Sequence, residues 1–352
     1  PVVRVMHRVQ AWDDFPELPV GRIGVYVGSH ACFSMQQTIA IDKFCATYDA
    51  VVICDHTSGY YGKYKLQPAL VQLQADATFP FPMSEEMFFL HYGKDGGNQQ
   101  AFLEEYRKIF DRVYQVIPEL PFSNIWTAMQ LSSRIPRGSL FHVGVSNTRR
   151  CWNMFHLPDG VESVSNVGCC GIDGCTSTLI GAALASPGRL CFLVTGDLAF
   201  FYDLNALGNR HVGHNVRILL INNGVGGEFR LSIHPCSAFG EEANKYMAAA
   251  GHFGNKSVEL VKHFATDLGY HYMAANNKEE FMAALPDFIN PDLPHSMILE
   301  VFTRPEDENE ALMRMTHIQS DTKGMMRSKL KSAVKSVMGE AGVAKIKDFI
   351  KK

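Results

Sequence analysis

Two apolar runs constrain the fold of this chain more than any other feature of its sequence. Residues Leu190–Val194 read LCFLV and lead into a Gly-Asp pair, and residues Val216–Ile221 read VRILLI and lead into Asn-Asn-Gly. Neither run alternates strictly with polar residues, which is typical of strands buried on both faces of a parallel sheet. The segment between them, Ala199–Asn209, has the pattern of a helix. We therefore predict a βαβ unit with polar residues just beyond the carboxyl ends of two neighbouring strands, where open α/β sheets bind ligands.

The polar residues at these strand ends form an oxygen-only ligand set. Asp197 offers a carboxylate and Asn223 an amide oxygen, a combination that suits Mg²⁺ or Ca²⁺ better than zinc. Magnesium in such a site usually keeps water and shares phosphate oxygens. The neighbouring glycines allow a ligand to approach the backbone closely, and the start of the helix offers free N–H groups to an anion. Either motif alone is most often an ordinary turn, but both motifs in one βαβ unit favour a metal-bridged diphosphate site.

The two motifs together resemble the signature of thiamine-diphosphate (ThDP) enzymes. In that family the Asp, the second Asn and a backbone carbonyl two residues later hold Mg²⁺ against the diphosphate. The resemblance implies that Asp197, Asn223 and Val225 are the metal ligands. Leu198 replaces the usual third glycine, and Tyr202–Asn205 reads YDLN. Both features resemble the carboligase of the menaquinone pathway in particular.

Two further segments resemble the same carboligase. They are Leu140–Arg150 (LFHVGVSNTRR) and Ser165–Ala183 (SNVGCCGIDGCTSTLIGAA), and the resemblance is specific over about residues 123–302 and weaker over residues 2–118. It implies that ThDP is bound by Gly144, Val145, Gly171, Ile172, Gly196, Asp197, Leu198, Ala199, Asn223, Val225 and Gly226. It implies substrate contacts for Ser146, Arg150, Glu228, Phe229 and Arg230. In this assignment Ile172 is the apolar wedge that bends the cofactor into its reactive V shape.

Three positions depart from the pattern of the menaquinone-pathway carboligase. Val167 stands where that enzyme has an arginine for a substrate carboxylate, Val145 replaces an asparagine, and Glu228 stands where an apolar residue is expected. A carboxylate at position 228 repels an acidic substrate unless Arg230 or another cation pairs with it. We therefore expect a divergent relative with different substrates.

The length and patterning of the chain predict an α/β protein with two Rossmann-like, doubly wound parallel-sheet domains. A chain of 352 residues fits two domains with ample core. We place a central Rossmann-like domain at 1–118, the ThDP diphosphate-binding domain at 119–303 and a basic helical tail at 304–352. In the first domain, Ile23–Val27 and Ala50–Cys54 read as strands around a helix, and residues 58–100 as irregular with short strands. A dinucleotide site after Gly28 is a weaker alternative, because the other glycines of that fingerprint are absent.

Composition limits the partners and the cellular compartment that we expect for the chain. The net charge of −3 implies no bulk attraction to nucleic acid, and no apolar run is long enough to predict a membrane span. Nine cysteines, an odd number without small-scaffold spacing, favour a reducing compartment. We expect a cytoplasmic protein.

The resemblance implies the Mg²⁺- and ThDP-binding portion of a carboligase that joins a 2-oxo acid to an acceptor, working as a homodimer or tetramer. The alternatives are a ThDP-dependent 2-oxo-acid decarboxylase and a non-catalytic cofactor-binding subunit. In that family a glutamate that activates the cofactor lies in an N-terminal pyrimidine-binding domain. We find no candidate for it and expect that domain elsewhere in the same or another chain. The chain alone is therefore expected to contain no catalytic residue and to be inactive.

Overall fold

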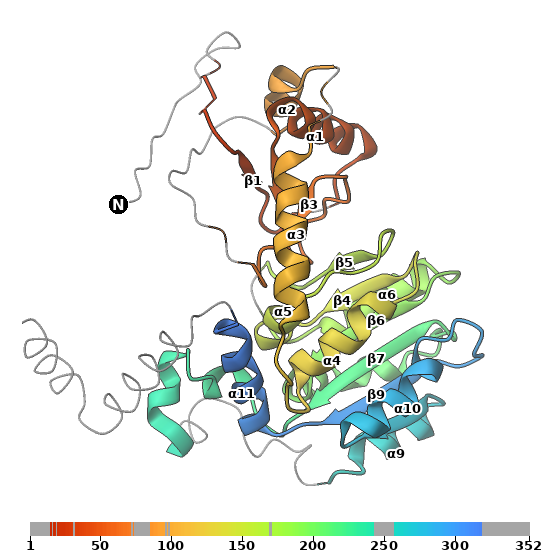
Figure 1. Cartoon of the computed structure of the whole chain (residues 1–352). Coiled ribbons are helices and arrows are strands. Elements are labelled where there is room, and N and C mark those ends of the chain that lie inside the picture. The colour runs from red at the N-terminus through yellow and green to blue at the C-terminus, as the bar shows by residue number, and fades with distance from the viewer. Residues whose placement is uncertain are drawn as a thin grey trace, which may run out of the picture.

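The chain contains two parallel sheets, each flanked by helices (Figure 1). The computed structural model describes residues 15, 17, 18, 20–30, 32–71, 73, 85–95, 97, 99–168, 171–242 and 257–318. Within these residues, one sheet has three strands in the order β1-β2-β3, and the other has six in the order β5-β4-β6-β7-β9-β8. Every strand pair is parallel. The predicted class, α/β with two parallel-sheet domains, is confirmed. Among the described residues, no helix has the length and apolar character needed to cross a membrane.

The smaller sheet is built as the strand–helix–strand pattern predicted. Its elements are β1 (Gly24–Tyr26), α1 (Met35–Tyr48), β2 (Val51–Ile53), β3 (Lys65–Leu66), α2 (Glu85–Tyr92) and α3 (Ala101–Gln115). Ser34 caps α1 through a capping box with Gln37, which satisfies free N–H groups at the start of the helix. The helix α2 lies in a stretch that was predicted to be irregular. Its aromatic residues pack on α1, with Phe44 5.5 Å from Phe89 between ring centroids, so tertiary packing supports a helix that the sequence pattern did not indicate.

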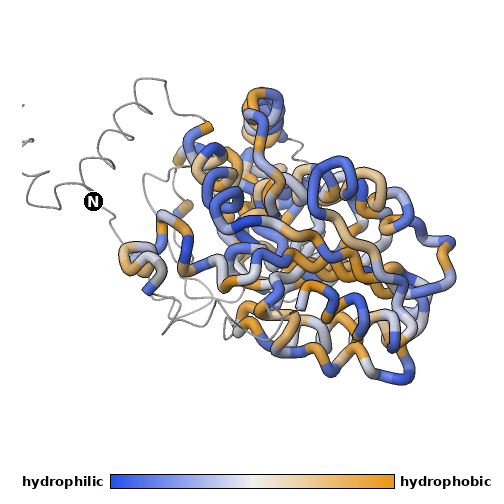
Figure 2. The backbone as a smooth tube through the Cα atoms, turned by 90° about the horizontal axis from the view of Figure 1, so that it is seen from below, coloured by the Kyte–Doolittle hydropathy of each residue, from blue (hydrophilic) through white to orange (hydrophobic). Residues whose placement is uncertain are grey.

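The larger sheet contains the two apolar runs at its centre. Its strands are β4 (Leu140–Val143), β5 (Glu162–Val164), β6 (Cys191–Gly196), β7 (Val216–Asn222), β8 (His271–Ala275) and β9 (Met297–Phe302). The helices around it are α4 (Asn124–Leu131), α5 (Asn147–Trp152), α6 (Cys175–Ala185), α7 (Asp197–Tyr202), α9 (Leu260–Asp267), α10 (Lys278–Phe288) and α11 (Pro305–Thr316). All but the last residue of β6 and of β7 are buried. Figure 2 shows the hydrophobic positions gathered along the strands.

The helix between β6 and β7 differs from the prediction. It begins at Asp197, two residues earlier than expected, and is interrupted after Tyr202. A short 3₁₀ helix, Leu204–Gly208, follows. Asp203 stands at the interruption, and its carboxylate accepts a hydrogen bond of 2.6 Å from the backbone N–H of Ser177 in α6. The helix is therefore interrupted at a residue that contacts α6. Periodicity in the sequence gives no sign of such a contact.

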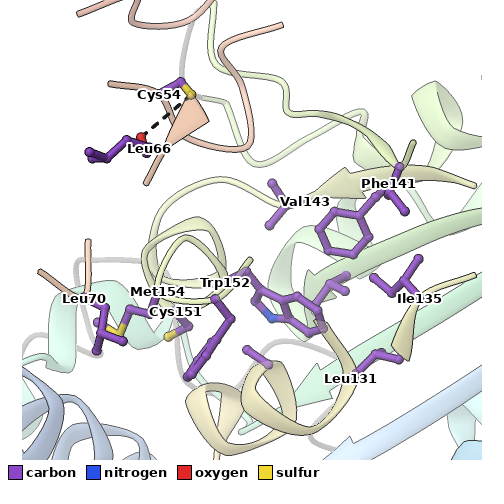
Figure 3. Packing of buried hydrophobic residues seen from close by; sticks show 14 of the residues in the cluster. Cys54, Leu66, Leu70, Leu131, Ile135, Phe141, Val143, Cys151, Trp152 and Met154 are labelled. Carbon is purple, nitrogen blue, oxygen red and sulfur yellow. Dashed lines mark hydrogen bonds between the residues drawn. The ribbon is translucent and has the colours of Figure 1, made fainter. Parts of the chain in front are cut away.

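The two sheets are joined through side chains of the first domain. The Tyr61 hydroxyl accepts from the Ser163 N–H at 2.9 Å and donates to the Ser163 carbonyl at 3.2 Å. It thereby satisfies backbone groups of β5, an edge strand. His56 Nε2 donates to the carbonyl of Trp152 at 2.8 Å. Trp152 is fully buried and packs with Phe141 (Figure 3), so α5 is held between the two domains.

The segment after β9 begins with an ordered helix. The predicted boundaries after residues 118 and 303 fall between α3 and α4 and between β9 and α11. The helix α11 starts with Pro305 and three acidic residues, and it buries Leu312 and Met315. It packs against α4. The basic part of the predicted tail, residues 319–352, lies outside the described residues.

Candidate functional site

The central strands of the larger sheet bring the predicted ligand residues to one edge. In the β6–β7 register, Gly196 lies beside Ile221, so the next residues along each strand, Asp197 and Asn222, are also neighbours. Adjacent strands run about 4.8 Å apart, which brings the Asp197 and Asn223 positions close together. Asp197 is only 2% exposed and starts α7. The βαβ unit expected from the sequence is therefore present, with its polar residues at the carboxyl edge.

The turn after β7 orders the second part of this edge. Asn222 Oδ1 accepts from the Gly224 N–H at 3.2 Å, and Asn223 Oδ1 accepts from the Val225 N–H at 3.1 Å. Gly224 has a φ of 74°, a conformation that glycine adopts without strain. The Asn223 side-chain oxygen and the Val225 backbone thus share one turn. With the Asp197 carboxylate, the donors are all oxygen and fit a hard divalent cation. Among the described residues, no group of three His, Cys, Asp or Glu side chains could hold a metal, so a cation here depends on amide and carbonyl oxygens as well.

Sequence reasoning missed Glu300, which supports the Asn pair from the next strand. Asn222 Nδ2 donates to Glu300 Oε1 at 2.7 Å, and the Tyr272 hydroxyl donates to Oε2 at 2.8 Å. Burial raises the pKa of Glu300 to about 7, and the negative charge of Asp197 contributes to the rise. The available signal was a single carboxylate inside the apolar strand β9, which reads MILEVF.

A second buried carboxyl group, Glu308, was also missed. Glu308 accepts from the Asn124 N–H at 2.9 and 3.1 Å and from the Thr303 hydroxyl at 2.7 Å. Burial raises its pKa to about 7, and Asp197 again adds to the rise. Asn124 Oδ1 in turn accepts from Trp152 Nε1 at 2.9 Å. Glu308 therefore ties α11 to the start of α4, and both buried carboxyl groups respond to the charge of Asp197.

The turn between β4 and α5 brings two more predicted residues to the same edge of the sheet. Gly144 lies so close to β6 that a Cβ atom there would be 3.0 Å from the Val194 carbonyl oxygen. Ser146 has φ 61° and ψ −127°, a combination that is strained for any residue except glycine. Strain of this kind is found most often at functional sites.

The two segments predicted to bind the cofactor rings are linked by a cysteine. The thiol of Cys175, the first residue of α6, donates to the Ile172 carbonyl at 3.8 Å. Burial raises the pKa of Cys175 to about 11, and the backbone of Val145 partly opposes this rise. Gly171 and Ile172 precede α6, and Leu198 lies in the first turn of α7. Cys169 and Cys170 lie outside the described residues.

The predicted substrate residues contain an ion pair that the sequence did not reveal. Arg150 Nη1 lies 2.9 Å from Glu228 Oε2, and Nη2 lies 2.8 Å from Oε1. The carboxylate raises the pKa of Arg150. Glu228 was expected to need Arg230 or another cation, and its partner is Arg150. The Nε of Arg230 is buried and has no hydrogen-bond partner within the described part of the chain. Phe229 stacks edge-on against His234 at 5.4 Å.

A family of known proteins is similar to this chain over most of the region that contains the larger sheet. Residues 148–301 match the family model of the thiamine pyrophosphate enzyme C-terminal TPP binding domain. Three similar curated proteins carry the name 2-succinyl-5-enolpyruvyl-6-hydroxy-3-cyclohexene-1-carboxylate synthase. The protein from Bacteroides fragilis is 36% identical over 201 residues, which is 57% of this chain and 35% of the relative. The protein from Phocaeicola vulgatus is 34% identical over 240 residues (68% and 40%), and that from Flavobacterium psychrophilum is 29% identical over 279 residues (76% and 48%).

These matches cover less than half the length of each relative. The match to the family model includes β6, β7 and all but the last residue of β9, and with them Asp197, Asn223 and the supporting Glu300. Residues 148–301 are thus a C-terminal TPP-binding domain of the thiamine pyrophosphate enzyme type, in a chain that resembles the 2-succinyl-5-enolpyruvyl-6-hydroxy-3-cyclohexene-1-carboxylate synthases.

Proposed function

We propose that this chain is the Mg²⁺- and ThDP-binding portion of a carboligase that acts on a 2-oxo acid and an acceptor. The observation that carries the proposal is the meeting of buried Asp197 with the Asn222-Asn223 turn at the ends of β6 and β7. Magnesium would be held by the Asp197 carboxylate, the Asn223 amide oxygen and the Val225 carbonyl. Because the pKa values of Glu300 and Glu308 are both raised partly by Asp197, a cation beside Asp197 would relieve the repulsion among these carboxyl groups.

The residues around this edge have distinct roles in the proposal. ThDP, when bound, supplies the carbanion chemistry that breaks and forms a carbon–carbon bond beside a 2-oxo group. The chain would bind its diphosphate through backbone groups near Gly196 and Gly226, and through the first turn of α7 at Leu198 and Ala199. Its rings would lie against Gly144, Val145, Gly171 and Ile172. These last segments are linked through Cys175, which supports a single preformed surface.

The pairing of Arg150 with Glu228 supports substrates that differ from those of the menaquinone-pathway synthases. An arginine binds a carboxylate through its two parallel N–H groups, and in Arg150 these already contact Glu228. Ser146, Phe229 and Arg230 are the remaining proposed substrate contacts. A free acidic substrate must therefore either displace Glu228 or bind through Arg230.

The proposal includes a pyrimidine-binding domain with an activating glutamate, in the same or another chain, and a dimeric or tetrameric assembly. It also includes a cytoplasmic location. The described cysteines are all free thiols, which is typical of proteins from reducing compartments. A ThDP-dependent decarboxylase, a transferase with another acceptor and a non-catalytic cofactor-binding subunit are alternatives that share the same site.

Calorimetric titration with ThDP in the presence of Mg²⁺ tests the site. We expect binding that disappears with a chelator and weakens at least a hundredfold in Asp197→Ala, because the metal loses the one charged side chain among its proposed protein ligands. The matched control is Asp292→Ala, which removes an exposed carboxylate and should leave affinity within twofold. Equal affinity of wild type and Asp197→Ala would reject the metal-bridged site. Product analysis with 2-oxo acids, in an assembly that includes the pyrimidine-binding domain, then separates a carboligase from a decarboxylase. Both release CO₂, but the decarboxylase releases a free aldehyde where the carboligase joins the remaining fragment to an acceptor.

A further inference from the structure

A cavity of about 640 Å³ lies where the first domain meets β5, apart from the edge that carries Asp197. Its wall residues come from the segment Tyr61–Gln67, from α3 with the preceding Gln100, and from the loop His156–Val161. Val161 directly precedes β5, so the cavity opens at the amino end of that strand, whereas the predicted metal ligands follow the carboxyl ends of strands. The volume is within the range of small-molecule sites.

The cavity wall contains three cations that form no ion pair within the described residues. Lys63, Lys65 and Arg107 all contribute to the wall, and within the described ranges no carboxylate lies at ion-pair distance from any of them. Two carboxylates, Asp111 and Asp159, also belong to the wall and are exposed. The wall therefore carries one net positive charge when its histidine is neutral.

The pKa of His156, the histidine of the cavity wall, responds to charged residues of the same wall. The pKa of His156 is lowered to about 4, first by burial and then by the charges of Lys65 and Arg107, while the charge of Asp111 partly opposes the shift. His156 is therefore neutral at physiological pH. Lys65 from β3 and Arg107 from α3 both line the cavity together with His156. An anion in the cavity would interact with both.

Aromatic rings form the other part of the wall, and they are held in place. The Tyr61 hydroxyl is anchored by two hydrogen bonds to Ser163, and Lys65 Nζ lies 5.6 Å from the Tyr61 ring centroid. The Tyr106 hydroxyl donates to the Gln67 carbonyl. Phe110 and His156 pack with their ring centroids 4.3 Å apart. Fixed rings beside cations suit a ligand that is both planar and anionic.

We propose that this cavity binds a small organic monoanion with a planar ring, a ring carboxylate, whose carboxylate lies between Lys65 and Arg107. The single net positive charge of the wall favours a monoanion over a phosphate dianion. Both domains contribute to the wall, so the bound ligand links β3 and α3 to the loop before β5. Binding should therefore stabilise the arrangement of the two domains.

Benzoate is a suitable probe, with benzamide as its uncharged counterpart and adenosine 5′-monophosphate as a ring-bearing dianion. In titration calorimetry with the full chain, we expect benzoate to bind in the millimolar range, as for a fragment of its size, and at least tenfold more tightly than benzamide. Arg107→Gln should weaken benzoate at least fivefold. Lys108→Gln, which removes the neighbouring exposed cation outside the wall, should leave it within twofold. A bound carboxylate should also raise the pKa of His156, measured by NMR, because it offsets the charges of Lys65 and Arg107.

Absence of benzoate binding, equal affinity for benzamide, or an unchanged affinity in Arg107→Gln would overturn the proposal. Tighter binding of adenosine 5′-monophosphate than of benzoate would overturn the assignment to a ring monocarboxylate and indicate a nucleotide site. Asp197→Ala should leave benzoate affinity unchanged, which separates this cavity from the proposed ThDP site. Thermal unfolding of Arg107→Gln checks that the exposed substitution leaves the fold intact.

Discussion

Arg150 and Glu228 form a two-pronged ion pair, with N–O distances of 2.9 and 2.8 Å, between α5 and the turn after β7. The side chains are 33% and 24% exposed, so the pair is partly shielded from solvent. It connects two segments that the family resemblance implies as substrate contacts, 78 positions apart in the chain. The pair neutralises Glu228 and at the same time occupies the guanidinium that we propose as a contact for a substrate carboxylate.

Replacement of Glu228 by glutamine should free Arg150 for a ligand. We expect Glu228→Gln to bind 2-oxoglutarate about tenfold more tightly, because a charged hydrogen bond contributes roughly 1.5–3 kcal/mol and part of that is spent on ordering the ligand. Calorimetric titration in the presence of Mg²⁺ and ThDP measures the effect. Glu228→Asp keeps the charge and serves as the control. Weaker or unchanged binding in Glu228→Gln would show that Arg150 does not face the substrate.

The strained backbone of Ser146 leads to a second prediction. Residues held at φ 61° and ψ −127° cost about 1–3 kcal/mol unless they are glycine. Ser146→Gly should therefore stabilise the folded chain by about 1 kcal/mol, after allowance for the greater freedom of glycine in the unfolded chain. Ser146→Ala keeps the strain and should differ little from wild type. Chemical denaturation measures both variants, and a loss of stability in Ser146→Gly would mean that the hydroxyl matters more than the strain.

The sequence was sufficient to predict the features that depend on residues close together along the chain. The apolar runs that became β6 and β7, and the polar residues at their ends, are local signals with a physical cause in burial. The pairing of Arg150 with Glu228 and the support of Asn222 by Glu300 depend on which strands and turns become neighbours. That order, with β9 placed between β7 and β8, is set by the packing of the whole sheet and has no local signal. The helix α2 escaped prediction for the same reason, because its aromatic residues are stabilised by α1.

Glu308 should make stability depend on pH. Its folded-state pKa of about 7 lies above the ordinary value of 4.5, so the folded chain holds this proton more tightly than the unfolded chain. The contribution to stability is complete below about pH 4.5 and is lost as pH rises through 7. At about 1.4 kcal/mol for each pKa unit, the loss is on the order of 3 kcal/mol at most.

Glu308→Gln tests this dependence, since glutamine cannot titrate. We expect the free energy of unfolding to fall less between pH 5 and pH 8 in the variant than in the wild type, whatever its absolute stability. Glu310→Gln removes an exposed carboxylate from the same helix and should retain the wild-type slope. Parallel pH profiles for wild type and Glu308→Gln would show that Glu308 remains ionised in the fold.

The close approach of β4 to β6 at Gly144 leads to the last prediction. A Cβ atom at this position would lie 3.0 Å from the Val194 carbonyl oxygen and 3.3 Å from Thr195 Cα. Both atoms are backbone atoms of a buried strand, and the Gly144 N–H also donates to the Val194 carbonyl at 2.7 Å. The neighbours therefore cannot yield as a flexible side chain would, and Gly144→Ala should destabilise the chain by about 1–3 kcal/mol.

The control for this prediction is Gly181, in α6, which has no atom within 4 Å of a Cβ position. Gly181→Ala should therefore be neutral or stabilising by up to about 1 kcal/mol. Thermal unfolding compares the two alanine variants directly. Because Thr195 lies two residues before Asp197, Gly144→Ala should also weaken Mg²⁺-dependent ThDP binding, whereas Gly181→Ala should not. Equal stability of the two variants would show that β4 can move away from β6 without disturbing the edge of the sheet that carries Asp197.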